Sequence, residues 1–260
     1  MTGTKKILIA GGVMLFLIAV AMAVKLICFP AAKNEWFQLN AQKLRHVPGG
    51  LVIVRPTHFP KSLHQGIVGV NTKGGRWLLG RNVSLQQLMA AAYDYNVSRV
   101  ELPPEAPTNN FDFLVTMPAK PDEYLQVALR EKFGYVAHPE TLDEDVLALK
   151  ITDENLPGLK VSDDNEKQNV VFRNRRIDFT HMQLTILSGA LEQMLGTPVV
   201  DKLGLTNFYD FSLPWDEQTQ RQLRNHTMTR DAATHLIAPW GITLQSASAS
   251  TQMLMVQKSD

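Results

Sequence analysis

The chain has a single cysteine, Cys28, among its 260 residues. One thiol excludes an intramolecular disulfide, a CxxC redox pair and a haem-attachment pair. An excess of charge of one sign is also missing, because 26 basic residues stand against 25 acidic ones and the net charge is +1. Such a balance gives no long-range field to steer a nucleic acid toward the surface. We therefore expect no nucleic acid among the partners.

The short motifs of common catalytic chemistries are absent as well. The sequence contains no GxxxxGK phosphate loop, no HExxH, no GxSxG and no SxxK, and these patterns place nucleophiles, metals or phosphates. Only His58 and His64 lie close together among the histidines, whereas a metal needs three or four converging ligands. We predict no catalytic residues, no metal and no cofactor, and the chain is expected not to be an enzyme.

One long apolar run stands at the N-terminus. Lys5 and Lys6 precede eighteen uncharged residues, 7–24, and after Lys25 the apolar residues continue to Phe29. At a rise of about 1.5 Å per residue, eighteen residues span about 27 Å, close to the hydrocarbon thickness of a bilayer. We predict that residues 1–30 are a transmembrane anchor or a signal peptide, with bilayer contact through residues 7–29.

Two alternatives remain for this segment. The Ala21-Met22-Ala23 triplet behind a positive end is typical of a cleavable signal peptide, but the apolar run is longer than usual and resumes after Lys25. As an anchor, it predicts a single-pass inner-membrane protein with a periplasmic C-terminal body. As a signal peptide, it predicts a secreted or periplasmic protein. Cys28 is predicted to be an incidental thiol at the interface.

The body divides by composition into a connecting region, two regular units and a linker. Residues 31–75 are rich in proline and glycine and contain one clear β-branched run at 51–54, which predicts a connecting region with a short strand. The polar stretch 153–168 contains a Pro-Gly pair and predicts a linker between units at 76–152 and 169–260.

The two units show the same predicted order of elements. In the first, Ser84 precedes a helical stripe that starts at Leu85, and a second helix ends near Gly134. Apolar residues at 135–137 and 146–150 predict a closing hairpin across an acidic turn at 143–145. In the second unit a helix runs from Leu184 to Gly196, and another lies around 232–237. Strands at 242–244 and 253–256 close it.

The spacing supports an internal duplication. Leu85 and Leu184 are 99 residues apart, and the triplet Phe111-Asp112-Phe113 recurs 98 residues later as Tyr209-Asp210-Phe211. The extra length of the second unit falls in the polar stretch 216–230, where a repeat tolerates insertion. The predicted fold class is α+β, with an N-terminal transmembrane helix followed by two similar β-α-β-β-α-β-β units in tandem.

Two motifs carry a resemblance to a known family. The segment 81–88, RNVSLQQL, continues to Ala92-Tyr93, and the segment 198–211 is PVVDKLGLTNFYDF. These segments resemble the "soil-associated" family of exported proteins of unknown function, which is abundant in acidobacteria and related soil bacteria. Leu203 and Asn207-Phe208 depart from the family pattern, which usually has Thr and Gly there. The resemblance covers about residues 50–258 and implies export without an established activity, substrate or cofactor.

The predicted units are also similar, as folds, to the short N-terminal domains of secretins and TonB-dependent receptors, which are protein-interaction modules. This likeness is an analogy of fold alone. It favours another envelope or membrane protein as the partner of this chain.

The second motif contains the one candidate site. We expect Asp201, Lys202 and Gly204 to form a turn between two strands, in which Asp201 accepts from backbone amides and Gly204 supplies a positive φ. Tyr209 and Asp210 follow in the next strand. The motif is predicted to be an interaction site or a structural turn.

A basic cluster lies at Arg173, Arg175 and Arg176, with Phe172 and Phe179 nearby. We expect a solvated strand edge that resists unwanted pairing, with contact to lipid headgroups as the alternative.

The sequence favours a membrane-tethered periplasmic interaction or scaffold protein without catalysis, which fits a subunit of a membrane complex. A small-molecule-binding or sensory ectodomain is the alternative, with the ligand held between the two units. An envelope hydrolase with an unfamiliar site is a third.

Overall fold

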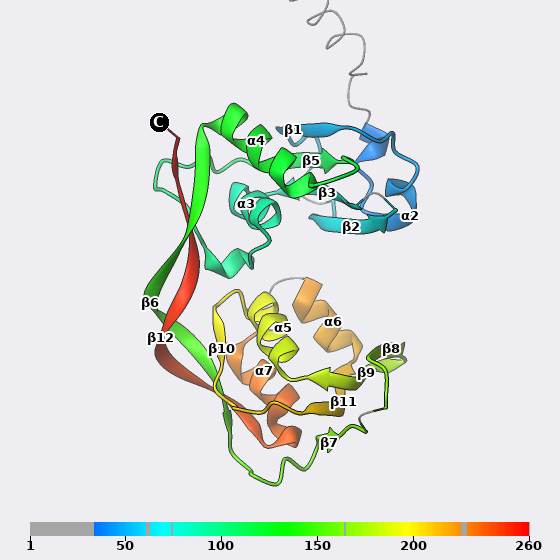
Figure 1. Cartoon of the computed structure of the whole chain (residues 1–260), viewed down its shortest axis with the longest axis vertical. Helices are drawn as coiled ribbons and strands as arrows, with labels where there is room; N and C mark the ends of the chain where they lie inside the picture. Colours follow the sequence, from blue (N-terminus) through cyan, green and yellow to red (C-terminus); the bar gives the residue numbers. More distant parts are fainter. Residues whose placement is uncertain (1–33, 61–62, 74, 164, 225–227, 260) are drawn as a thin grey trace, which may run out of the picture. The chain divides into compact units, whose positions relative to one another are not determined.

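A computed structural model of the chain describes residues 34–60, 63–73, 75–163, 165–224 and 228–259. In these residues the fold is mixed α+β, with six α-helices, three short 3-10 helices and twelve strands. The strands form three four-stranded sheets, which we call sheets A, B and C (Figure 1). The α+β class expected from the sequence is therefore confirmed.

The chain divides into two compact units that do not follow the chain in a simple order. Unit 1 comprises Met1–Val83 and Asn109–Ala128, and unit 2 comprises Ser84–Thr108 and Leu129–Asp260. Sheet A belongs to unit 1, while sheets B and C belong to unit 2. Each unit is described by itself below.

Unit 1 begins with two short helices, η1 (Asn34–Trp36) and α2 (Ala41–Leu44). Its strands are β1 (Val52–Pro56), β2 (Gly66–Thr72), β3 (Gly75–Val83) and β5 (Phe111–Val115), and sheet A has the order β1-β5-β3-β2 with every neighbour antiparallel. Phe37 and Leu44 are buried against Val70, Leu79 and Leu114 of this sheet. The two short helices thus cover apolar side chains of sheet A.

The strand predicted at 51–54 is confirmed as β1, but the residues around it do more than connect. β2 pairs with β3 from Gly66↔Arg81 to Thr72↔Gly75, so residues 66–72 are part of sheet A. Glycines at 66 and 69 weaken the sequence signal of this strand. Pairing with β3 therefore places residues 66–72 in a strand that their own sequence does not predict.

The first helix of unit 2 is α3 (Leu85–Tyr93), followed by η2 (Val97–Arg99) and β4 (Val100–Glu101). Ser84 caps α3 as expected, because its side chain accepts from the Gln87 N–H while the Gln87 side chain bonds the Ser84 N–H in return. The second predicted helix is α4 (Pro121–Phe133), and it is followed by Gly134 with φ 68°.

Sheet B is built around two seventeen-residue strands, β6 (Tyr135–Ile151) and β12 (Ile242–Lys258). They pair antiparallel along their whole length, and the sheet order is β10-β6-β12-β4, with β10 (Val199–Asp201) and β4 parallel to their neighbours. Figure 1 shows β6 and β12 as a long twisted ribbon. Strands from both predicted units therefore share one sheet, whereas the sequence predicted a separate sheet for each unit.

Two strand predictions were wrong here. The acidic segment 143–145 is not a turn, because it lies within β6 opposite Ser248, Ala249 and Ser250 of β12. These small uncharged partners place no like charge across from the carboxylates. For the same reason the strands predicted at 242–244 and 253–256 are one strand, since β6 pairs with the intervening residues.

Sheet C has the order β7-β11-β9-β8, formed by β7 (Lys160–Val161), β8 (Asn169–Arg173), β9 (Arg175–Gln183) and β11 (Phe208–Trp215). Its helices are α5 (Thr185–Leu195), α6 (Glu217–Arg224) and α7 (Arg230–Ile237), and η3 (Ala238–Trp240) follows α7. Leu187 and Leu191 of α5 and Ile237 of α7 share a buried core with Phe211 and Leu213 of β11. The α5 helix ends at Gly196 as predicted, with φ 65°.

Two segments predicted to be irregular contain regular structure. The linker 153–168 includes β7, which pairs with β11 through Val161↔Tyr209 and Lys160↔Asp210. The polar stretch 216–230 includes α6. Both elements are short and polar, so periodicity alone gives no signal for them.

Sheets A and C have the same strand order. Raising every strand number of sheet A by six converts β1-β5-β3-β2 into β7-β11-β9-β8. In sheet B, exchanging the strands whose numbers differ by six, β4 with β10 and β6 with β12, gives the same strand order in reverse.

The predicted transmembrane segment lies outside the described residues. None of the helices that the structure describes is long and apolar enough to cross a membrane.

Two glycines allow a matched test of packing. A Cβ at Gly80 of β3 would lie 2.0 Å from Cε1 of the fully buried Phe113. A Cβ at Gly189 of α5 would have no atom within 4 Å. We expect Gly80→Ala to lower the free energy of unfolding by about 1–3 kcal/mol through overpacking. Gly189→Ala is expected to raise it by about 0.5–1 kcal/mol through helix propensity.

Urea denaturation of the two variants beside the wild type measures both changes. Similar effects of the two substitutions would contradict the packing described for sheet A.

Candidate functional site

The predicted turn motif divides into two structurally different parts. Asp201 ends β10, and its Oδ1 accepts from the Leu203 N–H at 2.8 Å, while the Lys202 N–H donates to the Leu149 carbonyl at 3.2 Å. Gly204 has φ 68°. These residues form a turn between β10 and β11, in which Asp201 Oδ1 and the Lys202 N–H bond to groups of unit 2.

Tyr209 and Asp210 lie in β11, away from the turn, and they have separate roles. Tyr209 is buried. The Oδ1 of Asp210 accepts from Ser162 Oγ at 2.5 Å and from the His181 N–H at 3.0 Å, and Lys160 Nζ lies 3.5 Å from Oδ2. We call this set the Asp210 clamp, because it joins β7, β9 and β11.

The clamp changes the acidity of its carboxyl group. Burial raises the pKa of Asp210, but the hydrogen bonds from Ser162 and His181 and the positive charge of Lys160 outweigh it. The pKa of Asp210 therefore lies below its ordinary value of 3.8.

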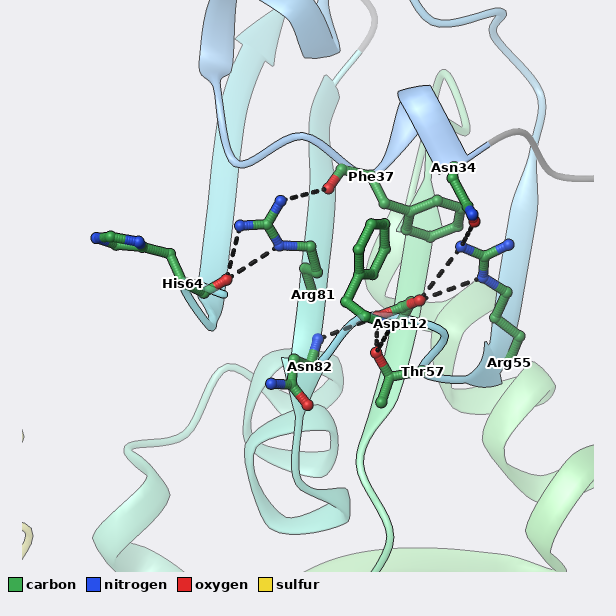
Figure 2. A network of polar contacts seen from close by, with 9 residues as sticks. Asn34, Phe37, Arg55, Thr57, His64, Arg81, Asn82 and Asp112 are labelled. Atoms are coloured by element: carbon green, nitrogen blue, oxygen red, sulfur yellow. Dashed lines mark hydrogen bonds and ion pairs between the residues drawn. The ribbon is translucent and has the colours of Figure 1, made fainter. Parts of the chain in front are cut away.

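A second carboxylate in unit 1 is held in the same manner. Asp112 of β5 is fully buried, and its Oδ1 accepts from Thr57 Oγ1 at 2.8 Å and from the Asn82 N–H at 3.1 Å. Its Oδ2 lies 3.3 Å from Nε and 3.2 Å from Nη2 of Arg55. Figure 2 shows these groups converging on Asp112 from β1 and β3. This set is the Asp112 clamp.

The two clamps agree in detail. In each, the residue whose cation lies beside Oδ2 comes two positions before the hydroxyl donor in the sequence. These residues are Arg55 and Thr57 in the Asp112 clamp, and Lys160 and Ser162 in the Asp210 clamp. In each, the N–H donor belongs to a non-glycine residue with positive φ, 56° at Asn82 and 52° at His181. Each also lies where the pairing register shifts, between Gly80 and Val83 in β3 and between Tyr209 and Phe211 in β11.

These clamps fix strands in place. Every carboxylate oxygen of the two clamps has a hydrogen-bond donor or a cation within the same sheet. The aromatic-Asp-aromatic triplets were visible in the sequence, but their donors come from strands 29–57 residues away in the chain. No local pattern marks such distant partners.

Near the Asp112 clamp, unit 1 contains an open cavity of about 700 Å³. Arg81 lies at its wall, donating from Nε and Nη2 to the His64 carbonyl at 3.0 and 2.7 Å (Figure 2). Its guanidinium lies 5.2 Å from the ring centroid of Phe59, another lining residue. The cavity combines a cation, an aromatic ring, several amide side chains and one carboxylate, Glu35.

A third carboxylate, Glu192 of α5, is buried in unit 2 with 1% of its surface exposed. It accepts from Arg99 Nε at 2.7 Å and Nη2 at 2.6 Å, from Ser98 Oγ at 2.7 Å and from the Val199 N–H at 3.1 Å. The hydrogen bond to Glu192 raises the pKa of Arg99. The ion pair joins α5 to η2 and to the start of β10. No local sequence pattern marks this ion pair, because Arg99 and Glu192 are 93 residues apart in the chain.

The hairpin of β8 and β9 differs from these internally satisfied groups because it exposes apolar side chains. Phe172 is 69% exposed and Val170 40% exposed, both on β8. The Phe172 ring makes an edge-on contact with Trp215, with ring centroids 6.4 Å apart. The strand edge expected at the basic cluster is present as β8, but its surface is more apolar than that of a fully protected edge.

The basic cluster of the hairpin is only partly neutralised. Arg173 and Arg176 both pair with Asp178, and each is more than half exposed. The Ser212 hydroxyl and both arginines lower the pKa of Asp178. Two cations thus share one carboxylate.

The dispersed histidines do not form a site in the part of the chain that the structure describes. His58 and His64 are exposed, and His181 stacks on Phe208 with ring centroids 4.2 Å apart. The described residues include no group of three or more His, Cys, Asp or Glu side chains that could hold a metal ion.

Comparison with known proteins finds one family, described as "Protein of unknown function (DUF3738)", which matches residues 86–258. This range covers more than half of the chain, so the protein belongs to that family. No curated protein and no solved structure matches the chain. The expectation of a family without assigned function is confirmed, while the soil-bacterial origin and the likeness to secretin domains stay predictions.

The Glu192 ion pair gives a test of structural importance. Glu192→Gln leaves the partly exposed Arg99 without its counter-charge, and we expect a loss of about 2 kcal/mol in the free energy of unfolding. The exposed pair of Lys120 and Glu123 is the matched control, since Glu123→Gln should change that free energy by less than about 0.5 kcal/mol. Chemical denaturation measures both, and equal effects would contradict a structural role of Glu192.

The Asp210 clamp predicts a dependence of stability on pH. Because the pKa of Asp210 is lower in the folded state, its contribution is present above about pH 4 and is lost as the pH falls through the folded pKa. We expect Asp210→Asn to reduce the slope of unfolding free energy against pH below about 4. Ser162→Ala, which removes one hydrogen bond, should reduce it by less. Denaturation curves between about pH 2 and 6 test this, and parallel slopes in all three proteins would refute it.

Proposed function

We propose that this member of the DUF3738 family is a non-catalytic interaction protein of the bacterial envelope, tethered to the inner membrane by residues 1–30. The body is periplasmic and docks to another envelope protein. The observation that carries the proposal is the free strand β8, an edge of sheet C that exposes Phe172 and Val170 beside Arg173. Exposed aromatic and arginine side chains are typical of protein interfaces.

The charged groups buried in the described residues support a binding role over a catalytic one. The carboxylates of Asp112 and Glu192 are each engaged by donors of their own unit. Buried polar groups whose hydrogen bonds are satisfied make the fold rigid, and a rigid fold can present a binding surface.

We also propose that the body arose by internal duplication. The equal strand order of sheets A and C supports this, and so does the matching of the Asp112 and Asp210 clamps. In this proposal β1 and β7 are equivalent strands. The first copy of the duplicated unit therefore includes β1 and starts before the predicted boundary at residue 76.

A small-molecule-binding ectodomain is the second candidate. The 700 Å³ cavity at Arg81 and Phe59 favours it, because a cation and an aromatic ring can orient a small anionic or aromatic ligand. In that case the body acts without a stoichiometric protein partner.

Purification of the tagged protein from its own membranes in mild detergent tests the interaction function. We expect an intact N-terminus by mass spectrometry and a companion protein in stoichiometric amount. Cys28→Ser is the control, because Cys28 is the only cysteine of the chain. A companion that co-purifies with the wild type but not with this variant would be held by an intermolecular disulfide. A mass that begins at Val24, together with a lone soluble monomer, would refute the tethered complex and favour the ligand-binding function.

A further inference from the structure

Sheet C ends in a strand whose outer backbone groups have no partner strand in the described residues. β8 pairs with β9 alone, from Asn169↔Thr180 to Arg173↔Arg176, and it stands last in the sheet order. A two-residue turn joins Arg173 to Arg176, and a hydrogen-bonded pair closes such a turn. By alternation, Val170 and Phe172 direct their N–H and C=O groups toward the free edge.

One face of β8 continues the apolar face of the sheet beyond the core. Val170 lies opposite Phe179, and Phe172 opposite Ile177. The next partners on β11, Phe211 and Leu213, are buried in the core of unit 2. The apolar face therefore runs from the core to the edge, where Val170 and Phe172 emerge into solvent.

The opposite face of β8 carries positive charge. Arg173 and Arg176 lie opposite each other, and Val171 lies opposite Asp178. Because both arginines pair with the same Asp178 carboxylate, one positive charge remains in excess on this face. An incoming strand meets apolar surface on one face and unbalanced positive charge on the other.

The other sheet edges are less suited to accept a strand. β4 and β7 have two residues each and β10 has three. β1 ends in a proline, and β2 contains glycines at 66 and 69. Short strands, prolines and glycines weaken pairing at an edge. Among the described edge strands, β8 has five residues with two exposed large apolar side chains, Val170 and Phe172, whereas β2 has one, Ile67.

We propose that β8 binds an extended segment of the partner protein, which adds a strand to sheet C and alternates apolar with acidic residues. Backbone hydrogen bonds to Val170 and Phe172 supply the pairing, and the alternating side chains supply the specificity. The apolar residues of the segment cover Phe172, and its carboxylates face Arg173 and Arg176. This inference rests on the proposed interaction function and names the surface and the kind of partner.

A synthetic peptide provides the test. The probe is a fluorescein-labelled peptide of about nine residues that alternates valine and glutamate, long enough to span β8. Its binding to the full-length protein in detergent is measured by fluorescence anisotropy. We expect it to bind at least about tenfold more tightly than a peptide with every second valine replaced by proline, which cannot extend a strand. A peptide with lysine in place of glutamate should bind several-fold more weakly.

Variants of the edge locate the binding. Phe172→Pro removes the outward N–H and the exposed ring while keeping the pairing with β9, and it should weaken binding of the glutamate peptide at least about tenfold. A double lysine variant, V170K/F172K, should do the same by placing charge on the apolar face. Ile186→Ala is the matched control, because Ile186 is a similarly exposed apolar residue on α5 and should leave binding unchanged. R173Q/R176Q should abolish the preference for glutamate over lysine.

Several outcomes overturn the inference. Equal binding to the wild type and both edge variants would show that the peptide binds elsewhere. If the wild type forms a dimer that Phe172→Pro dissociates, β8 pairs with a second copy of the chain and not with a partner protein. A membrane companion retained by Phe172→Pro would refute the edge assignment and leave the proposed function standing. If the wild type recovers no companion, the proposed function fails and this inference fails with it.

Discussion

An aspartate at a shift of strand register, fully buried at Asp112 and partly buried at Asp210, is the constraint on which sheets A and C each depend. A carboxylate removed from water is tolerated only when donors and a cation surround it. Asp112 meets this requirement by holding β1, β3 and β5 together, and Asp210 does so for β7, β9 and β11. The positive φ of Asn82 and His181 has an energetic cost, which the hydrogen bond of each N–H to the carboxylate helps to offset. The positions of three strands in each of these two sheets follow from this arrangement.

The same constraint explains why sheets A and C end as they do. Each clamp fixes three strands, and the fourth strand, β2 or β8, pairs with a single strand, β3 or β9. β2 and β8 contribute no residue to a clamp and stand last in their sheet orders. The outer edge of each strand is therefore open to solvent or to a partner. In sheet C the open strand is β8, which carries Phe172 and Arg173. The strand left outside the Asp210 clamp is thus the one whose surface we propose as functional.

The sequence predicted those elements whose signal is local. The Ser84 cap, the stripe from Leu85 and the stop at Gly196 each depend on a few neighbouring residues, and all three are confirmed. The acidic segment 143–145 was assigned to a turn because its partner, the Ser/Ala run of β12, lies about a hundred residues away. The clamps escaped prediction for the same reason. Of the candidate site, the turn at Asp201 and Gly204 could be placed from residue type alone, whereas the role of Asp210 in joining strands required knowledge of Ser162 and His181.

The central claim is that the protein acts by docking a partner strand on β8. Hydrogen exchange of the backbone amides of Val170 and Phe172 tests it most directly, compared between the protein in its native membranes and the purified protein in detergent. The account predicts exchange slowed by at least about tenfold in the membranes, with little change at amides already bonded between β8 and β9. Equal exchange at Val170 and Phe172 in both states would contradict it.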